Sequence, residues 1–534
     1  MDFKTISLTV TIVLAVATAA DLAAVMKRSL MMLQLNSYRN ERYTRWFNQS
    51  GESTTPWRLA ACIALFLTLV HHLPPVITLA VAAIIVICNF IALCRRRYKK
   101  PLVFTPRAKR LYAVMMGLAI IIPTIIGLLT GNLATACKVG LAEIVLSPIF
   151  ALSANVLLRP VEKSINRKYY NEAAAILRSM PALKVVGITG SYGKTSTKHY
   201  LHHILSQEFE TLMTPGSYNT TMGVIRTVRE MMRPYTQVFI AEMGAKQPGD
   251  IKEICDLVHP EIGIITAVGE QHLETFGSVE NVCRTKFELA DALPPDGLVV
   301  VNDGFEAARH REVSNVACRR YYAGNDKKIA TGADYRVVEV TYRPDGTRFT
   351  VEGPDGYRSE YSTPLMGECN IANLLGAIIV AKKLGVPEGK IAYALSTMPQ
   401  VEHRLSTKHT AGGLTIIDDA FNSNPQGSAM ALDVLALLDI PGRRFIITPG
   451  MIELGQRQYD ANREFGEKIG DCADIAIIVG QYNREAILEG IGDKLPKDSV
   501  ICAPDFTTAQ RIMTGMAKRG DAVLYENDLP DTFK

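Results

Sequence analysis

A glycine-rich segment followed by Lys and Thr carries the most evident chemistry in this sequence. Residues 187–197 read Gly-Ile-Thr-Gly-Ser-Tyr-Gly-Lys-Thr-Ser-Thr, between an apolar run and a helical pattern. Glycines let backbone N–H groups curl around phosphate oxygens, Lys194 can reach the β- and γ-phosphates, and the Thr195 hydroxyl can bind Mg²⁺. The alternative, an ordinary glycine-rich turn, does not need Lys and Thr after its last glycine. The segment predicts a nucleotide-binding loop with these contacts: Gly190, Ser191, Gly193, Lys194, Thr195 and Ser196.

This loop opens a series in which apolar, strand-like runs alternate with helical stretches. The runs are 184–189, 238–242, 262–268 and 298–302. Such alternation predicts a parallel sheet that is covered by helices on both faces. Between residues 335 and 362 the pattern changes to alternating β-type runs separated by Pro-Asp-Gly turns, which predicts antiparallel hairpins. A helix is expected over 370–384.

A second series of strands starts near residue 411 and predicts a smaller doubly wound domain. Its strands are expected at 414–418, 444–448, 475–479, 499–503 and 522–525. Ligands of such sheets bind at the carboxyl ends of the strands, where Glu242, Asn302-Asp303 and Asp418-Asp419 fall. The predicted fold class is therefore α/β, with a P-loop-type central ATPase domain at 181–405 and a smaller Rossmann-like C-terminal domain at 406–534.

Ahead of these domains, the sequence predicts an α-helical transmembrane region at 1–160 and a linker helix at 161–180. The chain is 48% hydrophobic, but most of its long apolar runs fall before residue 160. Roughly 20 apolar residues cross a bilayer as a helix, so about five spans are expected. The candidates are 6–26, 59–73, 76–94, 111–130 and 139–158, the second being short enough to be re-entrant instead. A cleaved signal peptide is the alternative for the first run, but its start has only Lys4 against Asp2.

Basic residues are distributed unevenly between these runs. Lys and Arg cluster after the first, third and fifth runs, whereas 71–75 has none and the turn that starts at Gly131 has only Lys138. The positive-inside rule then places the N-terminus outside and everything after residue 160 in the cytoplasm, which predicts a multi-pass protein of the cytoplasmic membrane. Glu143, inside the last run, is a functional candidate or pairs with Lys138 near the interface.

The overall charge and the cysteines exclude some functions. The net charge of +5 comes largely from the basic clusters beside the membrane, which favour anionic lipid and give no reason to expect nucleic acid. The 10 cysteines are scattered and form no Cys-x-x-Cys pair, so free thiols are expected.

Short motifs follow one another between residues 189 and 455. They are 189–197, Ala241-Glu-Met-Gly-Ala245, 269–277 with His272, Arg284-Thr-Lys-Phe-Glu288 with Lys286, Gly367-Glu-Cys-Asn-Ile-Ala-Asn373, Glu402-His-Arg-Leu405, Asp418-Asp-Ala-Phe-Asn-Ser-Asn-Pro425 and Gly450-Met-Ile-Glu-Leu-Gly455. In this order they resemble the motifs of the Mur ligase family, whose members build the peptidoglycan stem peptide by ATP-dependent amide formation. Several look most like the branch that adds D-alanyl-D-alanine to the UDP-muramoyl tripeptide. The resemblance covers roughly residues 180–490.

The resemblance implies a role for each matching residue of the phosphate and metal sites. Lys194 and the loop amides would hold the γ-phosphate, and Thr195 and Glu242 would bind one Mg²⁺. A second Mg²⁺ would lie between Glu242, His272 and a carbamylated Lys286, because carbamylation turns a lysine into an oxygen ligand. The alternatives without a metal are that His272 packs within its loop and that Lys286 is a solvated charge on a helix.

The same carry-over implies the contacts of the nucleotide and of the amine. Asn370 would face the adenine, Arg404 the phosphates and Asp419 the ribose. Capping of the helix that it starts is a second role for Asn370, and Arg404 at the surface is the alternative for that residue. The implied catalytic residues are Lys194, His272, Lys286 and Arg404. The amine-side pocket would include Asn422, Asn424 and Glu453.

The chain departs from the family pattern in ways that affect these expectations. Cys369 stands where the family usually has His, and Phe421 replaces the usual Tyr. Residues 525–530 lack the Lys-Gly-Ser run that is typical of the D-alanyl-D-alanine branch. A domain that grips the UDP-sugar is not recognisable, and the expected membrane spans occupy its place.

The expected function is therefore a membrane-anchored ligase of peptidoglycan precursor synthesis. It would use ATP and two Mg²⁺ to couple a muramoyl-peptide acceptor to an amino acid or dipeptide amine, with membrane lipid as a further partner. Alternatives are a lipid-linked acceptor, another polymer such as polyglutamate, and a scaffold that binds ATP without ligation and recruits wall enzymes. The intact set of candidate site residues argues against the scaffold.

Overall fold

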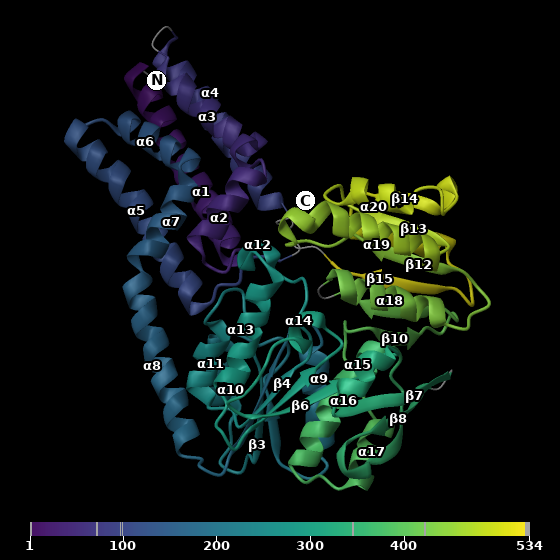
Figure 1. Ribbon diagram of the computed structural model, residues 1–534. Coiled ribbons are helices and arrows are strands. Elements are labelled where there is room, and N and C mark those ends of the chain that lie inside the picture. The colour runs from purple at the N-terminus through teal and green to yellow at the C-terminus, as the bar shows by residue number, and fades with distance from the viewer. Residues whose placement is uncertain are drawn as a thin grey trace. The chain divides into compact units, whose positions relative to one another are not determined.

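The computed structural model describes residues 3–70, 73–96, 98, 100–343, 346–420 and 423–528. The chain forms two compact units that meet in the sequence between Asn166 and Arg167. Helices alone make up the first unit, and strands and helices alternate in the second (Figure 1). This confirms the predicted α/β fold preceded by apolar helices.

The first unit contains fewer long helices than the apolar runs predict. Its elements are α1 (Phe3–Leu35), α2 (Asn40–Gln49), η1 (Glu52–Thr54), α3 (Pro56–Leu69), α4 (Pro75–Arg95), α5 (Pro106–Thr130), α6 (Leu133–Val145), α7 (Ser147–Leu157) and α8 (Arg159–Arg178), which continues into the second unit. Among the described residues, α1, α4 and α5 are long and apolar enough to cross a membrane. The helices α6 and α7 are bent by 79° and count as a fourth span if they act together. Because α3 has only 14 residues, length supports three or four spans where about five were expected.

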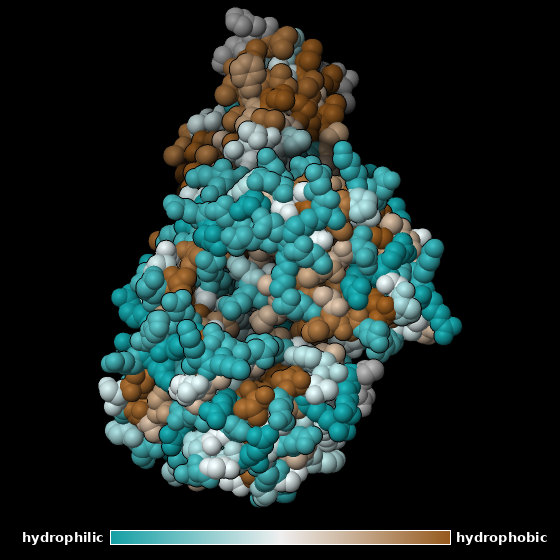
Figure 2. All heavy atoms as spheres, turned by 45° about the vertical axis from the view of Figure 1, so that its right-hand side comes forward, coloured by the Kyte–Doolittle hydropathy of each residue, from teal (hydrophilic) through white to brown (hydrophobic). Residues whose placement is uncertain are grey.

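The surface of these helices is unusually apolar for a folded unit. Hydrophobic residues gather over them, whereas the rest of the visible surface is mostly hydrophilic (Figure 2). Phe66, Leu128 and Leu129 are 67%, 79% and 82% exposed, respectively. Such a surface is stable when lipid rather than water surrounds it.

The buried charged groups of this unit include a paired cation and an unpaired carboxylate, and the carboxylate corrects an expectation. Arg28 forms a buried salt bridge with Glu52 at 2.7 Å. The predicted pair between Glu143 and Lys138 does not form: the buried Glu143 carboxylate has no hydrogen-bond partner among the described residues. Residues that face each other on a helix are three or four apart, and these two are separated by one position more.

A nine-stranded sheet forms the middle of the second unit. Its strands are β1 (Lys184–Thr189), β2 (Thr211–Met213), β3 (Val238–Glu242), β4 (Ile262–Ile265), β5 (Leu298–Asn302), β6 (Ala317–Tyr322), β7 (Tyr335–Arg343), β8 (Gly346–Glu352) and β9 (Arg358–Thr363), in the order β2-β3-β1-β4-β5-β6-β7-β8-β9. Pairing is parallel from β2 to β7, and β8 pairs antiparallel with both β7 and β9. The parallel sheet and the hairpins are thus confirmed, while the predicted turn residues Pro344 and Asp345 lie outside the described residues.

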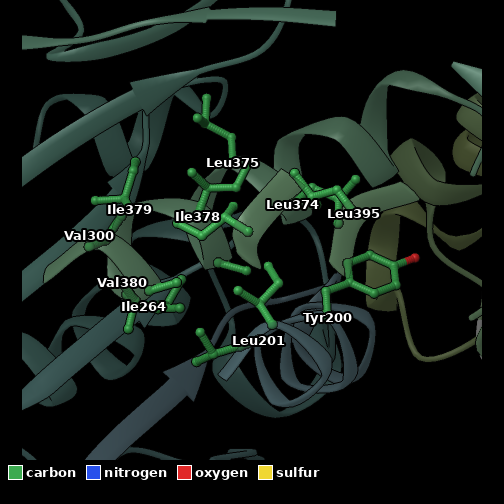
Figure 3. Packing of buried hydrophobic residues seen from close by; sticks show 14 of the residues in the cluster. Tyr200, Leu201, Ile264, Val300, Leu374, Leu375, Ile378, Ile379, Val380 and Leu395 are labelled. Carbon is green, nitrogen blue, oxygen red and sulfur yellow. The ribbon is translucent and has the colours of Figure 1, made fainter. Parts of the chain in front are cut away.

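Helices cover both faces of this sheet. Successive residues of β1 point to opposite sides, so Val185 and Val186 belong to different hydrophobic clusters. One face packs against α9 (Lys194–Leu205), α16 (Glu368–Lys383) and α17 (Glu388–Ser396), through Tyr200, Leu374 and Leu395 among others (Figure 3). The other face packs against α10 (Thr221–Met231), α11 (Asp250–Val258) and α13 (Val279–Asp291). Both ends of the glycine-rich loop are therefore held by buried elements.

The C-terminal part of the second unit has its own six-stranded sheet. Its strands are β10 (Ser406–His409), β11 (Thr415–Asp419), β12 (Arg444–Thr448), β13 (Ile475–Val479), β14 (Val500–Ala503) and β15 (Ala522–Glu526), in the order β10-β11-β15-β12-β13-β14. The sheet is parallel apart from β10. Its helices are α18 (Pro425–Leu437), α19 (Gln458–Cys472), α20 (Arg484–Ile491) and α21 (Phe506–Met516). This confirms the smaller doubly wound domain.

Candidate active site

The glycine-rich loop connects the end of β1 to the first residue of α9. Gly193 has a left-handed backbone, φ 80°, and a Cβ there would lie 2.4 Å from Asn373 Oδ1. The Lys194 ammonium folds back over the loop and donates to the carbonyl oxygens of Gly190 and Ser191, at 2.6 and 3.1 Å. Burial lowers the pKa of Lys194 to about 8. The loop thus holds its cation at the N-terminus of a helix, which is where a phosphate binds.

Glu242, at the end of β3, lies directly beside the loop. Its Oε1 accepts from the Thr195 hydroxyl at 3.2 Å and from Asn219 Nδ2 at 3.1 Å. Its Oε2 accepts from Lys198 Nζ at 2.9 Å, within a pair that is almost completely buried. Burial raises the pKa of Glu242. The charges of Lys198 and Lys194, together with its hydrogen bonds, lower this pKa by more than burial raises it, so the net shift is downward. A carboxylate and a hydroxyl in contact are a donor set that fits Mg²⁺.

Lys286, on α13, is also a buried cation of this region. Its side chain is buried, and it makes no hydrogen bond or salt bridge with the described residues. Burial, and then the charge of Lys194, lower its pKa well below the usual range for lysine. A neutral amine is the form that reacts with CO₂, so this environment fits carbamylation.

His272 lies in the loop between β4 and the short helix α12 (Leu273–Phe276). Its Nδ1 is paired with Glu453 Oε2 from the C-terminal domain. Burial lowers the pKa of His272 against the opposing effect of Glu453, and the charges of Lys246 and Lys286 lower it further. A neutral imidazole is the form that binds metal ions. The described residues contain no group of three His, Cys, Asp or Glu side chains arranged for a metal, and the predicted set relies on a hydroxyl and a modified lysine instead.

One cavity of about 240 Å³ brings most of the predicted nucleotide contacts together. The predicted residues that line it are Ser191, Gly193, Lys194, Thr195, Ser196, Glu242, Asn370, Arg404, Asp419 and Asn424. Arg404 lies 3.4 Å from the Thr195 hydroxyl, and Asp419 accepts from the Leu405 N–H at 3.1 Å. Gly190, His272, Lys286 and Glu453 do not line this cavity. It fits a nucleotide because its polar walls come from both domains around the loop.

The structure places the remaining predicted residues differently. Asn370 does not cap α16, because the helix begins two residues earlier and Gly367 is its N-cap. Its side chain instead accepts from Tyr200 and donates to the Met366 carbonyl. Asn424 caps α18 by accepting from the Gly427 N–H at 2.8 Å. Asn422 and Phe421 lie outside the described residues.

Two residues that hold Glu242 in place are absent from the sequence prediction. Lys198 is one helical turn after Lys194 in α9 and is fully buried, and the spacing of four residues could have indicated a shared face. Asn219, in the loop before α10, is brought to Glu242 only by the fold, and no local pattern indicates it.

Comparisons with known proteins agree with this geometry. The Mur ligase middle domain profile matches residues 188–381, and the profile of the Mur ligase glutamate ligase domain matches residues 403–525. The UDP-N-acetylmuramoyl-tripeptide–D-alanyl-D-alanine ligase of Escherichia coli K12 is 31% identical over 330 residues, which are 61% of this chain and 71% of that protein. The enzyme of the same name from Mycobacterium tuberculosis H37Rv is 30% identical over 421 residues, 73% of this chain and 80% of that protein.

Solved structures share the fold of the second unit. MurF from Acinetobacter baumannii has a TM-score of 0.59 at 25% identity and covers 68% of this chain and 77% of its own. MurF from Thermotoga maritima, solved in complex with ADP, has a TM-score of 0.60 at 24% identity and covers 68% of this chain and 80% of its own. Together with the phosphate loop and the two-domain cavity, these relatives define an ATP-dependent ligase. More specifically, the chain belongs to the Mur ligase family.

Proposed function

We propose that this protein couples D-alanyl-D-alanine to a muramoyl tripeptide at the expense of ATP. The proposal rests chiefly on relatives that are at least 30% identical, such as the Escherichia coli and Mycobacterium tuberculosis enzymes, because both are named for that reaction. The cavity around Lys194, Thr195 and Arg404 supports it, since it supplies the cations that a transferring phosphoryl group needs.

The reaction has two steps that balance without any further reagent. The acceptor carboxylate attacks the γ-phosphorus of ATP, and the bond to the bridging oxygen breaks to release ADP. The amine nitrogen then attacks the acyl carbon, the bond to phosphate breaks, and the nitrogen loses a proton. Lys194 and Arg404 neutralise charge during the first step, and the walls of the cavity keep the reacting groups together.

Thr195 and Glu242 would hold one Mg²⁺ beside the phosphates, because their oxygens are already in contact. A second ion would be held by Glu242, His272 and a carbamylated Lys286. Bound divalent ions would polarise the phosphoryl oxygens. The buried, unpaired state of Lys286 supports this assignment.

The nucleotide and amine contacts follow the same assignment. Asn370 would lie near the adenine, Arg404 near the phosphates and Asp419 near the ribose, in keeping with their places in the cavity. The predicted amine-side residues Asn422 and Asn424 belong to this proposal as well. The capping bond of Asn424 leaves its amide nitrogen as the group available to the amine substrate.

We further infer that the protein resides in the cytoplasmic membrane with its catalytic domains in the cytoplasm. In the described part of the chain, three helices are long and apolar enough to span a bilayer, and exposed Phe66, Leu128 and Leu129 suit a lipid environment. The basic residues beside the predicted spans support the orientation.

A lipid-linked muramoyl peptide is a second candidate for the acceptor. The described residues before β1 form helices only, so they contain no sheet of the kind that binds nucleotides in α/β domains. A membrane-embedded helical unit could instead keep the enzyme beside a substrate that is itself held in the bilayer.

A transfer assay with the purified full-length protein in detergent tests these proposals. Radiolabelled amines, including D-alanyl-D-alanine, alanine and glutamate, are offered with UDP-linked and with lipid-linked muramoyl tripeptide, and ATP turnover is recorded in parallel. Transfer of D-alanyl-D-alanine to either acceptor is expected. Transfer of glutamate alone would contradict the amine assignment, and transfer to the UDP-linked acceptor alone would exclude the lipid version.

The same assay includes variants of the phosphate site. Lys194→Ala should lower ATP turnover at least about 100-fold, because one preorganised charge is worth that much in similar sites. The matched control is Lys184→Ala, which removes an exposed lysine paired with Glu261 at the start of β1. Unchanged turnover in Lys194→Ala would contradict the assignment of the loop.

A further inference from the structure

A contact between His272 and Glu453 joins the middle and C-terminal domains of the second unit. The two residues are 181 positions apart in the sequence, and His272 Nδ1 is paired with Glu453 Oε2. His272 follows β4, whereas Glu453 lies in the loop after β12. A carboxylate can only accept a hydrogen bond, so a neutral His272 carries its proton on Nδ1 and keeps its Nε2 lone pair for another partner.

Both residues adopt a backbone conformation that side chains other than glycine rarely take. The φ angle is 51° at His272 and 63° at Glu453. The left-handed conformation costs about 1–2 kcal/mol for each such residue, and strained residues persist where the surrounding structure holds them, commonly at functional sites. Two strained residues that meet each other across a domain boundary indicate that the contact itself is under constraint.

The loop that carries Glu453 is held by hydrogen bonds from two buried asparagines to its backbone. Asn462 Oδ1 accepts from the Met451 N–H at 2.8 Å, and Asn483 Nδ2 donates to the Pro449 carbonyl at 2.9 Å. Both asparagines are buried. Arg457, four residues after Glu453, lies 3.4 Å from Glu270 and forms a second ion pair between the two domains. Glu453 is therefore presented to His272 by a fixed element rather than by a mobile loop.

We propose that Glu453 is a positioning residue for the divalent-cation site, acting through His272. By holding the Nδ1 proton, its carboxylate fixes the ring with Nε2 available to the cation. Because Glu453 comes from the C-terminal domain, the imidazole is oriented only while the two domains are in contact. The proposal rests on the metal role of His272 given above, and it assigns the Glu453 carboxylate to the metal side instead of to the amine substrate.

Mn²⁺ binding, followed by electron paramagnetic resonance on the full-length protein in detergent with ADP present, tests this proposal. Mn²⁺ replaces Mg²⁺ as the probe because its spectrum reports both the affinity and the symmetry of the site. Glu453→Gln should weaken the His272-dependent Mn²⁺ site about tenfold, as is typical when the orienting partner of a metal-bound histidine is removed. ADP affinity without metal and the thermal midpoint should not change. The matched control is Glu467→Gln, which removes an exposed carboxylate of α19 paired with Arg463.

A double variant separates the possible explanations. If Glu453 acts through His272, Glu453→Gln added to His272→Asn should cause no further loss of Mn²⁺ affinity. Additive losses, or a raised KM for the amine with unchanged Mn²⁺ binding, would overturn the proposal. If His272→Asn leaves Mn²⁺ binding unchanged, the metal role of His272 fails and this inference fails with it. If His272→Asn lowers the Mn²⁺ affinity and Glu453→Gln does not, the positioning role of Glu453 fails while the metal role of His272 stands.

Discussion

Lys286 has the environment that is most difficult to explain without chemistry. A buried lysine without a salt bridge is costly, and the charges of Asp250 and Glu288 offset the desolvation of the Lys286 ammonium only in part. Burial and the nearby Lys194 both lower its pKa, so the neutral amine dominates over a wider pH range than usual. By contrast, Lys198 in the same region is paired with Glu242 at 2.9 Å and serves to orient that carboxylate.

Replacement of Lys286 therefore tests its predicted role as a carbamylated ligand. Lys286→Ala should lower ligation at least about 100-fold, and formate or acetate should restore part of the activity by supplying the missing oxygen ligand. Product formation with and without added carboxylate measures this effect. Lys252→Ala, at an exposed lysine of α11 paired with Asp256, serves as the control. Full activity in Lys286→Ala would contradict the assignment.

At the scale of elements, the turn from β1 into α9 depends on one backbone conformation. Gly193 and Gly249 both have left-handed φ angles, 80° and 91°, directly before a helix. They differ in surroundings: a Cβ at Gly193 would lie 2.4 Å from Asn373 Oδ1, whereas a Cβ at Gly249 would meet nothing within 4 Å.

This difference predicts unequal effects of the same substitution. Gly193→Ala should weaken nucleotide binding more than about tenfold, because the strain of about 1–2 kcal/mol is combined with a clash that displaces the loop. Gly249→Ala carries only the backbone strain and should leave nucleotide affinity unchanged. Calorimetric titration with ADP measures both variants, and equal affinities would show that the loop tolerates a side chain at Gly193.

The ends of β11 and β15 hold two carboxyl groups opposite each other. Asp419 and Glu526 are paired in the strand register, and burial raises the pKa of Asp419 to about 7. Burial, and then Asp419, raise the pKa of Glu526 well above its usual 4.5. Ser423 donates to Glu526 Oε1 at 2.7 Å, while Oε2 has no partner among the described residues.

This pair should make stability depend on pH in a definite direction. Because the pKa of Glu526 is higher in the folded than in the unfolded state, stability is lost as the pH rises from about 4.5 through the raised value. Glu526→Gln should therefore be more stable than the natural protein at pH 8, by about 1.4 kcal/mol for each unit of pKa shift, and should show a flatter pH profile. Thermal midpoints between pH 5 and pH 8 measure this, with Glu489→Gln at an exposed carboxylate as the control. A variant that loses stability equally at all pH values would contradict the explanation.

For the whole molecule, the distribution of basic residues and the lengths of the helices predict different membrane crossings. Basic residues lie near the ends of both α1 and α4, so the positive-inside rule requires α3 to return the chain across the membrane between them. The 14 residues of α3 span about 21 Å at 1.5 Å each, which is less than the roughly 30 Å of a hydrocarbon core. A short helix can cross where the bilayer thins locally.

Cysteine accessibility should show whether or not α3 crosses the membrane. In an otherwise cysteine-free protein, Leu73→Cys and Asn132→Cys should react with a membrane-impermeant maleimide in intact cells, because both lie in the connections that are poor in positive charge. A separate variant that keeps the exposed natural Cys502 as its single cysteine should react only in inverted vesicles. Labelling of Leu73→Cys only from the cytoplasmic side would mean that α3 does not cross.

Features that arise from local periodicity could be predicted from the order of the amino acids alone. Alternation of apolar runs with helical stretches predicted β1, β3, β5, β12 and β13 residue for residue, because buried parallel strands are continuous hydrophobic runs. The spacing of Gly193, Lys194 and Thr195 likewise predicted the phosphate loop. Strands without that signal were not predicted: β6 contains two arginines, β2 has three residues, and β10 is a polar edge strand.

Contacts between side chains that are distant in the chain could not be predicted without the folded structure. No local pattern relates Asn219 to Glu242, and none relates Glu453 to His272. The first contact depends on the order of the strands, and the second depends on the contact between the middle and C-terminal domains. The apolar runs of the first 160 residues indicated helices, but not the 79° bend between α6 and α7. Hydrophobic composition specifies what must be buried from water, whereas the packing of the neighbouring elements specifies where each helix bends and which groups come into contact.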